Sequence, residues 1–399
     1  MSYSLQLMTP VIDGGTSPIV SLTDIALGWE RVIHLQGGYW SGHFDILGDA
    51  SELTDYFYNW LNLHIQEESG GLRTWEGRIV EMDLSTGNAT RRKSLLTMAN
   101  KVRVDYTDDN GDSQRTAWAT QAQSIAQYGE QWEILGAYDY IQLTAEAKRA
   151  FYLAHNAWPI ARPAGGIAAA EYAALSVTVG GYIGTLNNRY TTTGVGVGNL
   201  SARISEIVTT DSEFLVVTRI DTNTVQVSNV LDDDSPIRPW DLILEYAELG
   251  DADQNLWRFF VDNDRRVYYH QLATQPTYFL RGGQVYLSSG GGAALEPWQM
   301  QPGIYRDLDV PVSGKEKGSV LDDLRDIIVD KVRVSADGQY TLSAADIMYD
   351  EQFDALQNYL VAEIPKVAEI PEKKRKFTWP TMNEAQRAWL RGRIGPYPG

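Results

Sequence analysis

The sequence predicts a β-rich α+β protein of several domains, and three observations lead to this prediction. Alternating apolar residues that run into Gly- and Asn-containing turns, as ahead of Asp109-Asn110-Gly111, are typical of β-hairpins. The 22 Tyr and 12 Trp are many for 399 residues, as in β-rich proteins and interaction surfaces. Short amphipathic stretches that end at Gly or Pro predict a few helices. The length favours two to four domains.

Two hairpins and a long strand are predicted before residue 116. Residues 31–35 and 39–47 flank Gly37-Gly38, a pair that permits a tight turn between strands. Residues 74–84 alternate in polarity over their whole length and predict one strand. The second hairpin starts at residue 101, where Val102, Val104 and Tyr106 alternate.

Two helices are predicted in the same half of the chain. Residues 50–65 predict a helix with Ser51 as its cap. One face of this helix would carry Leu53, Phe57, Trp60, Leu61 and His64. Residues 143–158 predict a second helix, which Pro159 would end. Its helical spacing is carried by Ala145, Ala147, Ala150, Phe151 and Ala154.

The second half predicts mostly strands. Residues 175–230 are rich in Val, Thr and Ile, which predicts an all-β stretch. Pro239 opens a short predicted helix that Gly250 would follow. Strands are predicted at 256–261 and 266–271, on either side of a turn at Asp262-Asn263-Asp264. Residues 319–330 predict a helix that leads into a strand, and residues 347–361 are amphipathic.

The C-terminal residues 365–399 predict an extended arm. They contain prolines at 365, 371, 380, 396 and 398 and the basic run 373–376. Such a segment, with aromatic residues at Phe377, Trp379, Trp389 and Tyr397, cannot build its own core, so we expect it to become ordered against a neighbouring, acidic subunit or to stay disordered.

Charge and cysteine content exclude several classes of function. A net charge of -18 argues against a surface that binds nucleic acid, because phosphates repel it. With 0 Cys there is no disulfide, thiolate metal site or cysteine nucleophile. No apolar run approaches the ~18 residues of a membrane span. The N-terminus lacks a basic region followed by an apolar core, so no signal peptide is predicted.

A search for reaction chemistry predicts no catalytic, cofactor-binding or metal-binding residue. The five histidines do not occur at zinc-binding spacing; they are His34, His43, His64, His155 and His270. Nucleophile-elbow and phosphate-loop motifs are absent. The glycines of residues 193–199 lack a lysine and a following helical pattern, so a loop is favoured there.

Three acidic sites leave alternatives open. Asp251 to Asn255 matches the first ligands of a calcium loop, but Leu256 stands where Gly is needed, so a solvated turn is favoured. Asp232 to Asp234 is either an exposed loop or a weak cation site. A glycosidase needs two carboxylates across a cleft, and Glu76 or Glu245 could serve. The same two residues equally fit the polar face of a strand and of a helix.

A short internal echo permits two related β units. The sequence KVRV occurs at residues 101–104 and again at 331–334, and each copy is followed by an Asn-Gly or Asp-Gly turn. One four-residue identity is expected by chance in a chain of this length, so the shared context of apolar lead-in, strand, turn and strand is the better argument.

Four blocks resemble the hub proteins of phage tails, namely the baseplate or tail-tip hubs of siphophages, which are related to contractile-tail baseplate hubs. These blocks are WEGRIV at 75–80, SIAQYG at 124–129 with the following helix and Pro159, PWDLI at 239–243 with LGD at 249–251, and PWQMQPG at 297–303 with Asp307 and Asp309. In order they cover residues 30–350. The chain departs from many siphophage hubs because it has no long C-terminal lysin or fibre extension.

The resemblance implies a non-enzymatic virion protein that is assembled in the host cytoplasm. It implies β-barrel-like hub domains, a homotrimer, and two similar barrels per subunit that join a threefold tip to a sixfold tail tube. Partners would be distal tail or tube proteins, a fibre or spike, and the tape measure. Genome DNA would pass an acidic lumen without specific binding. The rivals are a hexameric distal-tail or receptor-binding protein and a tail-associated glycan hydrolase.

The domain organisation predicted on this basis has five segments. A first barrel-like domain with one helix spans 1–116, and an α+β helical segment spans 117–165. A β-rich middle domain spans 166–310. An α+β segment that completes the second barrel spans 311–363, and the basic Pro-rich arm spans 364–399.

Overall fold

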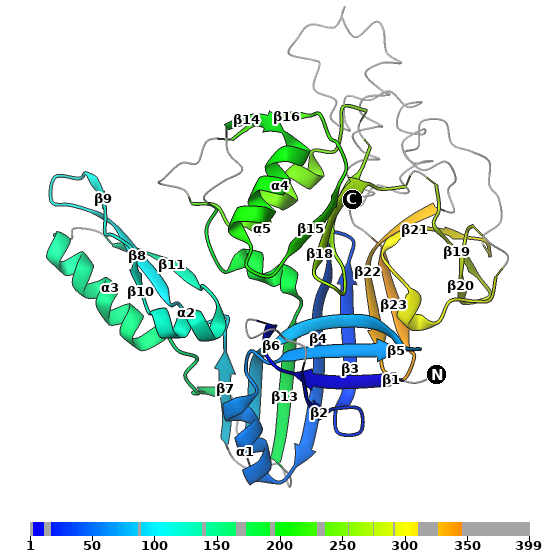
Figure 1. Ribbon diagram of the computed structural model, residues 1–399, viewed down its shortest axis with the longest axis horizontal. Coiled ribbons are helices and arrows are strands. Elements are labelled where there is room, and N and C mark those ends of the chain that lie inside the picture. The colour runs from blue at the N-terminus through cyan, green and yellow to red at the C-terminus, as the bar shows by residue number, and fades with distance from the viewer. Residues whose placement is uncertain are drawn as a thin grey trace, which may run out of the picture. The chain divides into compact units, whose positions relative to one another are not determined.

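The computed structural model confirms a β-rich α+β fold with short helices (Figure 1). It describes residues 3–11, 17–86, 89–137, 141–164, 173–191, 196–229, 236–253, 255–273, 275–289, 292–309 and 326–344. The chain divides into two compact units, and all described residues belong to the unit formed by Met1–Pro311 and Arg325–Ala345. The amphipathic residues 347–361, the arm and Asp232 to Asp234 lie outside the described residues.

Within the described ranges, seventeen strands join into one branched sheet. They are β1 (Tyr3–Met8), β2 (Pro18–Ser21), β3 (Leu27–His34), β4 (Gly37–Gly48), β5 (His64–Ser69), β6 (Leu72–Thr86), β7 (Ala89–Ser94), β12 (Arg162–Ala164), β13 (Ala173–Gly180), β15 (Val216–Ile220), β17 (Trp257–Val261), β18 (Arg266–Gln271), β19 (Tyr278–Arg281), β20 (Gln284–Leu287), β21 (Gly303–Asp307), β22 (Asp326–Ser335) and β23 (Tyr340–Ala344).

The remaining elements form two small sheets and several helices. One sheet contains β8 (Lys101–Thr107), β9 (Ser113–Arg115), β10 (Ala119–Thr120) and β11 (Trp132–Ala137), and the other pairs β14 (Gly196–Asn199) with β16 (Gln226–Asn229). The helices are α1 (Ala50–Asn59), α2 (Ala122–Tyr128), α3 (Gln142–Asn156), α4 (Leu200–Asp211), α5 (Pro239–Glu248), and the 3-10 helices η2 (Tyr182–Asn187) and η3 (Pro297–Gln299).

Strand β4 is where the branches of the large sheet meet. It pairs with β3 and β13 along its length and with β17 at its first residues. From β13 the sheet continues through β6 to β5 and β1, and from β3 through β22 to β21 and β19. Among the described residues the strands form no closed barrel, so the barrel-like architecture is not confirmed.

The predicted hairpin around Gly37-Gly38 is confirmed as β3 and β4, and Gly38 shows why glycine is needed there. Its φ is +77°, and a Cβ on it would lie 2.2 Å from the carbonyl oxygen of Val261. Only glycine lets β17 approach the backbone of β4 this closely. The turn therefore also fixes a contact between distant parts of the chain.

The predicted helix at residues 50–65 is wrong in its second half. Helix α1 ends at Asn59, Asn62 adopts φ 71°, and His64 begins β5. The cap is also two residues earlier than the expected Ser51, because the Asp49 carboxylate accepts a hydrogen bond from the backbone N of Ser51 at 2.8 Å. The short helix buries Leu53 and Phe57 against β4, β6 and β13.

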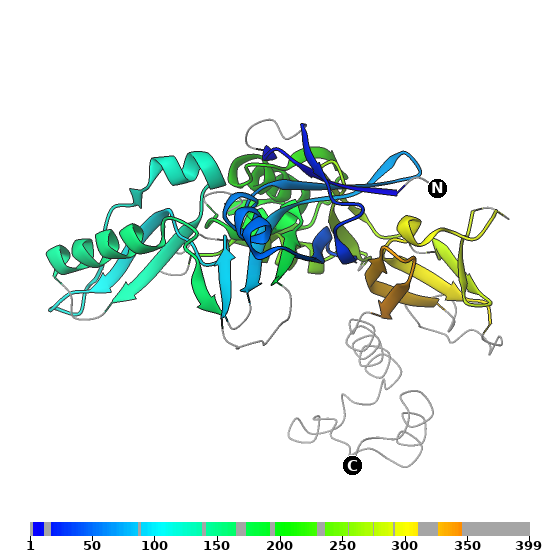
Figure 2. The ribbon, with the colours of Figure 1, turned by 90° about the horizontal axis from the view of Figure 1, so that it is seen from below.

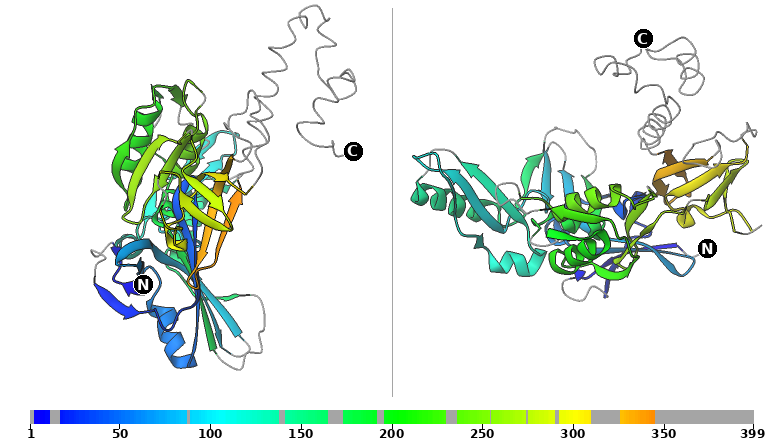
Figure 3. Two further views of the ribbon diagram at one scale, coloured as in Figure 1. Left: turned by 90° about the vertical axis from the view of Figure 1, so that its right-hand side faces the viewer. Right: turned by 90° about the horizontal axis from the view of Figure 1, so that it is seen from above.

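The predicted all-β stretch at residues 175–230 is also wrong, since it contains η2 and α4. Helix α4 buries residues at helical spacing, namely Leu200, Ile204, Ile207 and Val208. With α5 it covers the core that β15, β17 and β18 share, which Figure 3 shows as green helices against yellow-green strands. The helix predicted from Pro239 is confirmed as α5.

The second sheet and its helices confirm the prediction for residues 101–158. Helix α3 contacts β8 and β10, and the teal helices lie along the cyan strands in Figure 2. Strand β8 pairs antiparallel with β9 and β10 and parallel with β11. The repeated KVRV sequence forms a strand followed by a hairpin in both copies, but β8 and β22 belong to different sheets. The predicted domain boundaries stay a prediction.

Candidate functional site

Glu76 lies in a buried cluster of charged and polar side chains on β5 and β6. Glu76 is 2% exposed and lies within β6. His64 of β5 lies on the same face, because His64 pairs with Arg78 and Gln66 pairs with Glu76 across the two strands. Tyr182 of η2 and Arg265 of the β17–β18 turn complete this cluster with Arg73, and we call it the Glu76 cluster.

The distances in the Glu76 cluster are those of a connected network. Arg265 Nε lies 3.1 Å from Glu76 Oε1, and Arg73 Nη1 lies 3.3 Å from Oε2. His64 Nε2 lies 3.5 Å from Oε2, while His64 Nδ1 lies 2.9 Å from the Tyr182 hydroxyl. Arg73 also pairs with Asp264 at 2.6 Å. The network therefore ties β5 and β6 to η2 and to the β17–β18 turn.

Burial dominates the protonation of the Glu76 cluster. It raises the pKa of Glu76 to about 7, although Arg265 and Arg73 oppose the shift. It lowers the pKa of His64 to about 3, and the two arginines add to that effect. Both shifts favour the neutral forms of the two side chains, a neutral histidine beside a carboxyl group that titrates near neutrality.

A second buried charge pair lies on the opposite face of the same strands. Arg31 of β3 pairs with Glu67 of β5, and the two residues are 1% and 5% exposed. Glu67 also accepts hydrogen bonds from Trp29 Nε1 at 3.2 Å and from Thr74 Oγ1 at 2.9 Å. Because Glu67 lies opposite Trp75 and Glu76 lies opposite Gln66, the two buried carboxylates point to opposite faces.

This geometry bears on the carboxylates singled out in the sequence. Glu76 and Glu67 do not face one common space, and the oxygens of Glu67 are engaged by hydrogen bonds and an ion pair. Glu245 lies exposed on α5. The structure thus does not bring Glu76 and Glu245 together as a glycosidase pair. No signal in the sequence distinguished the buried Glu76 and Glu67 from the other acidic residues.

The Asp251 turn is held by its own hydrogen bonds. The Asp251 carboxylate accepts from the backbone N of Asp253 and Asn255 and from Trp257 Nε1, each at 3.0 Å. This supports the interpretation as a turn. Across the described residues, no group of three or more His, Asp or Glu side chains is placed to hold a metal ion. Of residues 193–199, the described part, 196–199, forms β14.

The other histidines are dispersed. His34 and His270 are half-buried on β3 and β18, His43 lies 3.5 Å from Asp45 on β4, and His155 is exposed at the end of α3. Within the described ranges no helix has both the length and the apolar character that a membrane span requires.

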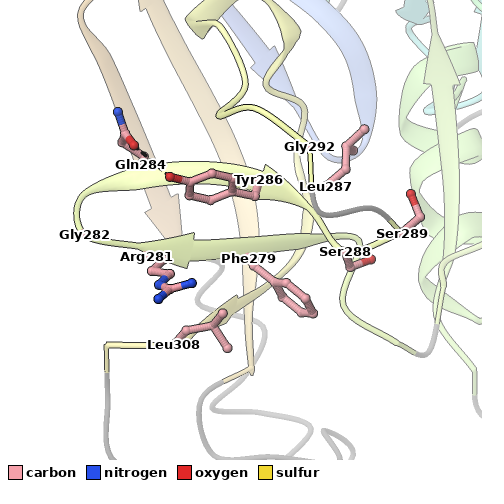
Figure 4. A pocket seen from close by; sticks show the side chains of 10 residues that line it. All are labelled: Phe279, Arg281, Gly282, Gln284, Tyr286, Leu287, Ser288, Ser289, Gly292 and Leu308. Carbon is pink, nitrogen blue, oxygen red and sulfur yellow. Dashed lines mark hydrogen bonds between the residues drawn. The ribbon is translucent and has the colours of Figure 1, made fainter.

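A shallow depression of about 790 Å³ lies on β19 and β20 (Figure 4). Phe279, Arg281 and Tyr286 extend from the two strands, and Leu308 lies beside them. Neighbouring residues 290–291 and 310–325 are outside the described part of the chain, so the depression is not assigned a ligand.

Helix α3 turns its apolar face outward. Leu143 is 72% exposed and Phe151 is 66% exposed. With the exposed Ala147, Ala150 and Ala154 they form one uncharged stripe, which we call the α3 stripe. The inward side carries the cations instead: Lys148 Nζ donates to the Gly136 carbonyl at 2.6 Å, and Arg149 donates to that of Ala117. The sequence predicted this helix but not which face is exposed.

The comparisons with known proteins rest on structure alone, since no family model matches the chain and no curated protein does. A 43 kDa tail protein of prophage MuSo2 from Shewanella oneidensis is similar at TM-score 0.39, with 8% identity over 87% of this chain and 97% of that one. The tail protein from Neisseria meningitidis MC58 is similar at TM-score 0.42, with the same identity and coverage. These two neighbours are thus tail proteins, one of them from a prophage.

Proposed function

We propose that this protein is a structural component of a phage tail, a homotrimeric hub that joins the sixfold tail tube to the threefold tip. The observation that carries the proposal is the α3 stripe. An exposed apolar face that several residues of one helix share is a feature of sites of protein association. The protein would then act through contacts between subunits, without a reaction centre of its own.

The next copy in the ring is the partner we assign to the α3 stripe. Two chains of net charge -18 repel each other, and contact along a surface without charged side chains avoids part of this cost. In a threefold ring each interface is heterologous, so the stripe contacts a different surface of the adjacent copy. Tube, tape-measure and fibre or spike proteins would bind the faces that remain.

The blocks that resemble phage tail hubs supply the second line of support. Residues 75–80 lie within β6, where Trp75 is fully buried and Glu76 belongs to its cluster. Residues 124–129 contain the last turns of α2 and its C-cap, Gly129, whose φ is +78°. Residues 239–243 begin α5, and residues 297–299 form η3. The residues that carry the resemblance thus lie in β6, at the end of α2, at the start of α5 and in η3.

Mass photometry of the purified chain tests the proposal. A trimer has three times the subunit mass of 44.6 kDa, and we expect that species at micromolar concentration and threefold symmetry in averaged electron micrographs. A hexamer would favour the distal-tail alternative. A stable monomer that cleaves a cell-wall glycan would overturn the proposal in favour of a hydrolase.

A further inference from the structure

A cavity of about 450 Å³ lies between the large sheet, η2 and β11. Two tryptophans line it, Trp40 from β4 and Trp132 from β11, and both are partly exposed. Trp40 packs against Trp240 at a ring-centroid distance of 5.5 Å, and Lys101 Nζ lies 3.6 Å from the centre of the Trp132 ring. These contacts hold both indole rings in place before any ligand arrives.

The polar lining includes a buried amide with an unused donor. Gln131 is 6% exposed, and its side-chain Nε2 has no hydrogen-bond partner among the described residues. Its backbone N–H donates a hydrogen bond to Asn100 Oδ1 at 2.8 Å, which fixes the position of the residue. A buried donor without an acceptor is costly, so the cavity offers a site for an acceptor atom.

Charges of both signs surround the same space. Glu133 of β11 lines the cavity, and burial raises the pKa of its carboxyl group while Arg238 opposes the shift. Arg238 donates to the Asn187 carbonyl and stacks over Tyr190 at 4.8 Å. Arg78 lines the cavity as well, but its guanidinium already donates to Asn62 Oδ1 and to the Tyr128 carbonyl. An anion would meet Glu133 and a cation would meet the two arginines, whereas a neutral ligand with hydroxyl groups can donate to Glu133 and accept from Gln131.

We propose that this cavity binds a ring of a neutral carbohydrate. The aromatic faces suit the apolar C–H surface of a sugar ring, and the amide, carboxylate and guanidinium suit its hydroxyl groups. The volume falls in the range of small-molecule sites. The inference does not depend on the proposed tail function, since a sugar site and a subunit contact are separate surfaces.

Glycine 184 offers a sharp test, because a Cβ there would meet no atom within 4 Å and its φ is not positive. The variant Gly184→Leu should therefore add a side chain at the wall of the cavity without a clash at its Cβ. Gly136→Leu is the matched control: its Cβ would also meet nothing within 4 Å, and it lies on β11 outside the cavity lining. Glu133→Gln, with Glu245→Gln as its control, keeps the test valid if Gly184→Leu does not fold.

The full chain would be titrated with glucose, galactose, N-acetylglucosamine, lactose and chitobiose, by tryptophan fluorescence and saturation-transfer NMR. We expect at least one sugar to bind, with affinity at least tenfold weaker in Gly184→Leu or Glu133→Gln and unchanged in the two controls. Absence of binding by every sugar would overturn the proposal, as would equal binding by Gly184→Leu. A change in tryptophan fluorescence with a short Ala-rich peptide and with none of the sugars would overturn the proposal and assign the cavity to a protein partner.

Discussion

Arg265 of the β17–β18 turn forms an ion pair with Glu76 in the middle of β6, its Nε 3.1 Å from Oε1. Arg265 has φ 60°, a left-handed conformation that costs a non-glycine residue about 1–2 kcal/mol. Asn263 of the same turn donates to the Arg73 carbonyl. The turn therefore adopts its conformation through contacts with β6, and the two parts of the sheet support each other.

Replacing Glu76 should change how stability depends on pH. The pKa of Glu76 is about 7 in the folded state against an ordinary value of 4.5, so its contribution is fully present below pH 4.5 and is lost as the pH rises through 7. In Glu76→Gln this loss of about 3 kcal/mol should disappear. Urea unfolding at intervals from pH 4.5 to 8 measures the difference between the two proteins.

The exposed Glu245 provides the control for that experiment. Glu245→Gln should keep the pH dependence of the unmodified protein. If the unfolding free energy of Glu76→Gln also ran parallel to that of the unmodified protein across this pH range, the raised pKa of Glu76 would be refuted. His64 acts in the opposite direction, since its lowered pKa stabilises the fold above pH 6.5 and this contribution is lost as the pH falls toward 3. Because both proteins contain His64, its contribution cancels in the difference between Glu76→Gln and the unmodified protein, and that difference from pH 4.5 to 8 isolates Glu76.

Removing Arg31 should destabilise the protein strongly. Arg31→Met leaves the Glu67 carboxylate buried with only its neutral donors, which costs about 3–5 kcal/mol of unfolding free energy. The double variant Arg31→Met with Glu67→Leu should recover much of this loss, because no unpaired charge remains. The exposed pair Arg92 and Asp83 is the comparison: Arg92→Met should cost about 0–1 kcal/mol. Equal losses at both sites would contradict the role of burial.

Alanine at Gly38 should be poorly tolerated. Its Cβ would lie 2.2 Å from the Val261 carbonyl oxygen, so β17 must move away from β4, and we expect a loss of at least about 2 kcal/mol. Gly111→Ala separates the two causes, since Gly111 has φ +84° with no atom within 4 Å of a Cβ. That variant should lose only about 1 kcal/mol, and thermal unfolding of both would reveal the difference.

Polar substitutions on the α3 stripe should weaken assembly and leave folding intact. Leu143→Ser and Phe151→Ser remove exposed side chains, so the free energy of unfolding should change by no more than about 0.5 kcal/mol. The trimer expected from the proposed function should dissociate, as seen by mass photometry. Leu72→Ser, at a residue 60% exposed on β6, is the control and should remain trimeric. Trimers that persist in both α3 variants would exclude the stripe as the interface.

Patterns within the sequence predicted much of the local structure. Alternation and Asn-Gly or Gly-Gly turns predicted β3–β4 and β8–β9, and Pro239 and Pro159 marked helix limits. Helix α4 was missed because its Val, Thr and Ile content favours strands, although Leu200, Ile204, Ile207 and Val208 have helical spacing. Packing overrode the intrinsic propensity of that segment.

Local sequence decided the turns, the strand alternation and the helix periodicity, since each depends on neighbours within a few positions. Composition decided the acidic charge and the absence of cysteine. The tertiary structure alone decided that Glu76 is buried while Glu245 is exposed, that Arg265 meets β6, and that α3 presents its apolar face outward. Burial and charge pairing depend on segments brought together from far along the chain, and periodicity carries no information about which distant segment covers a given face.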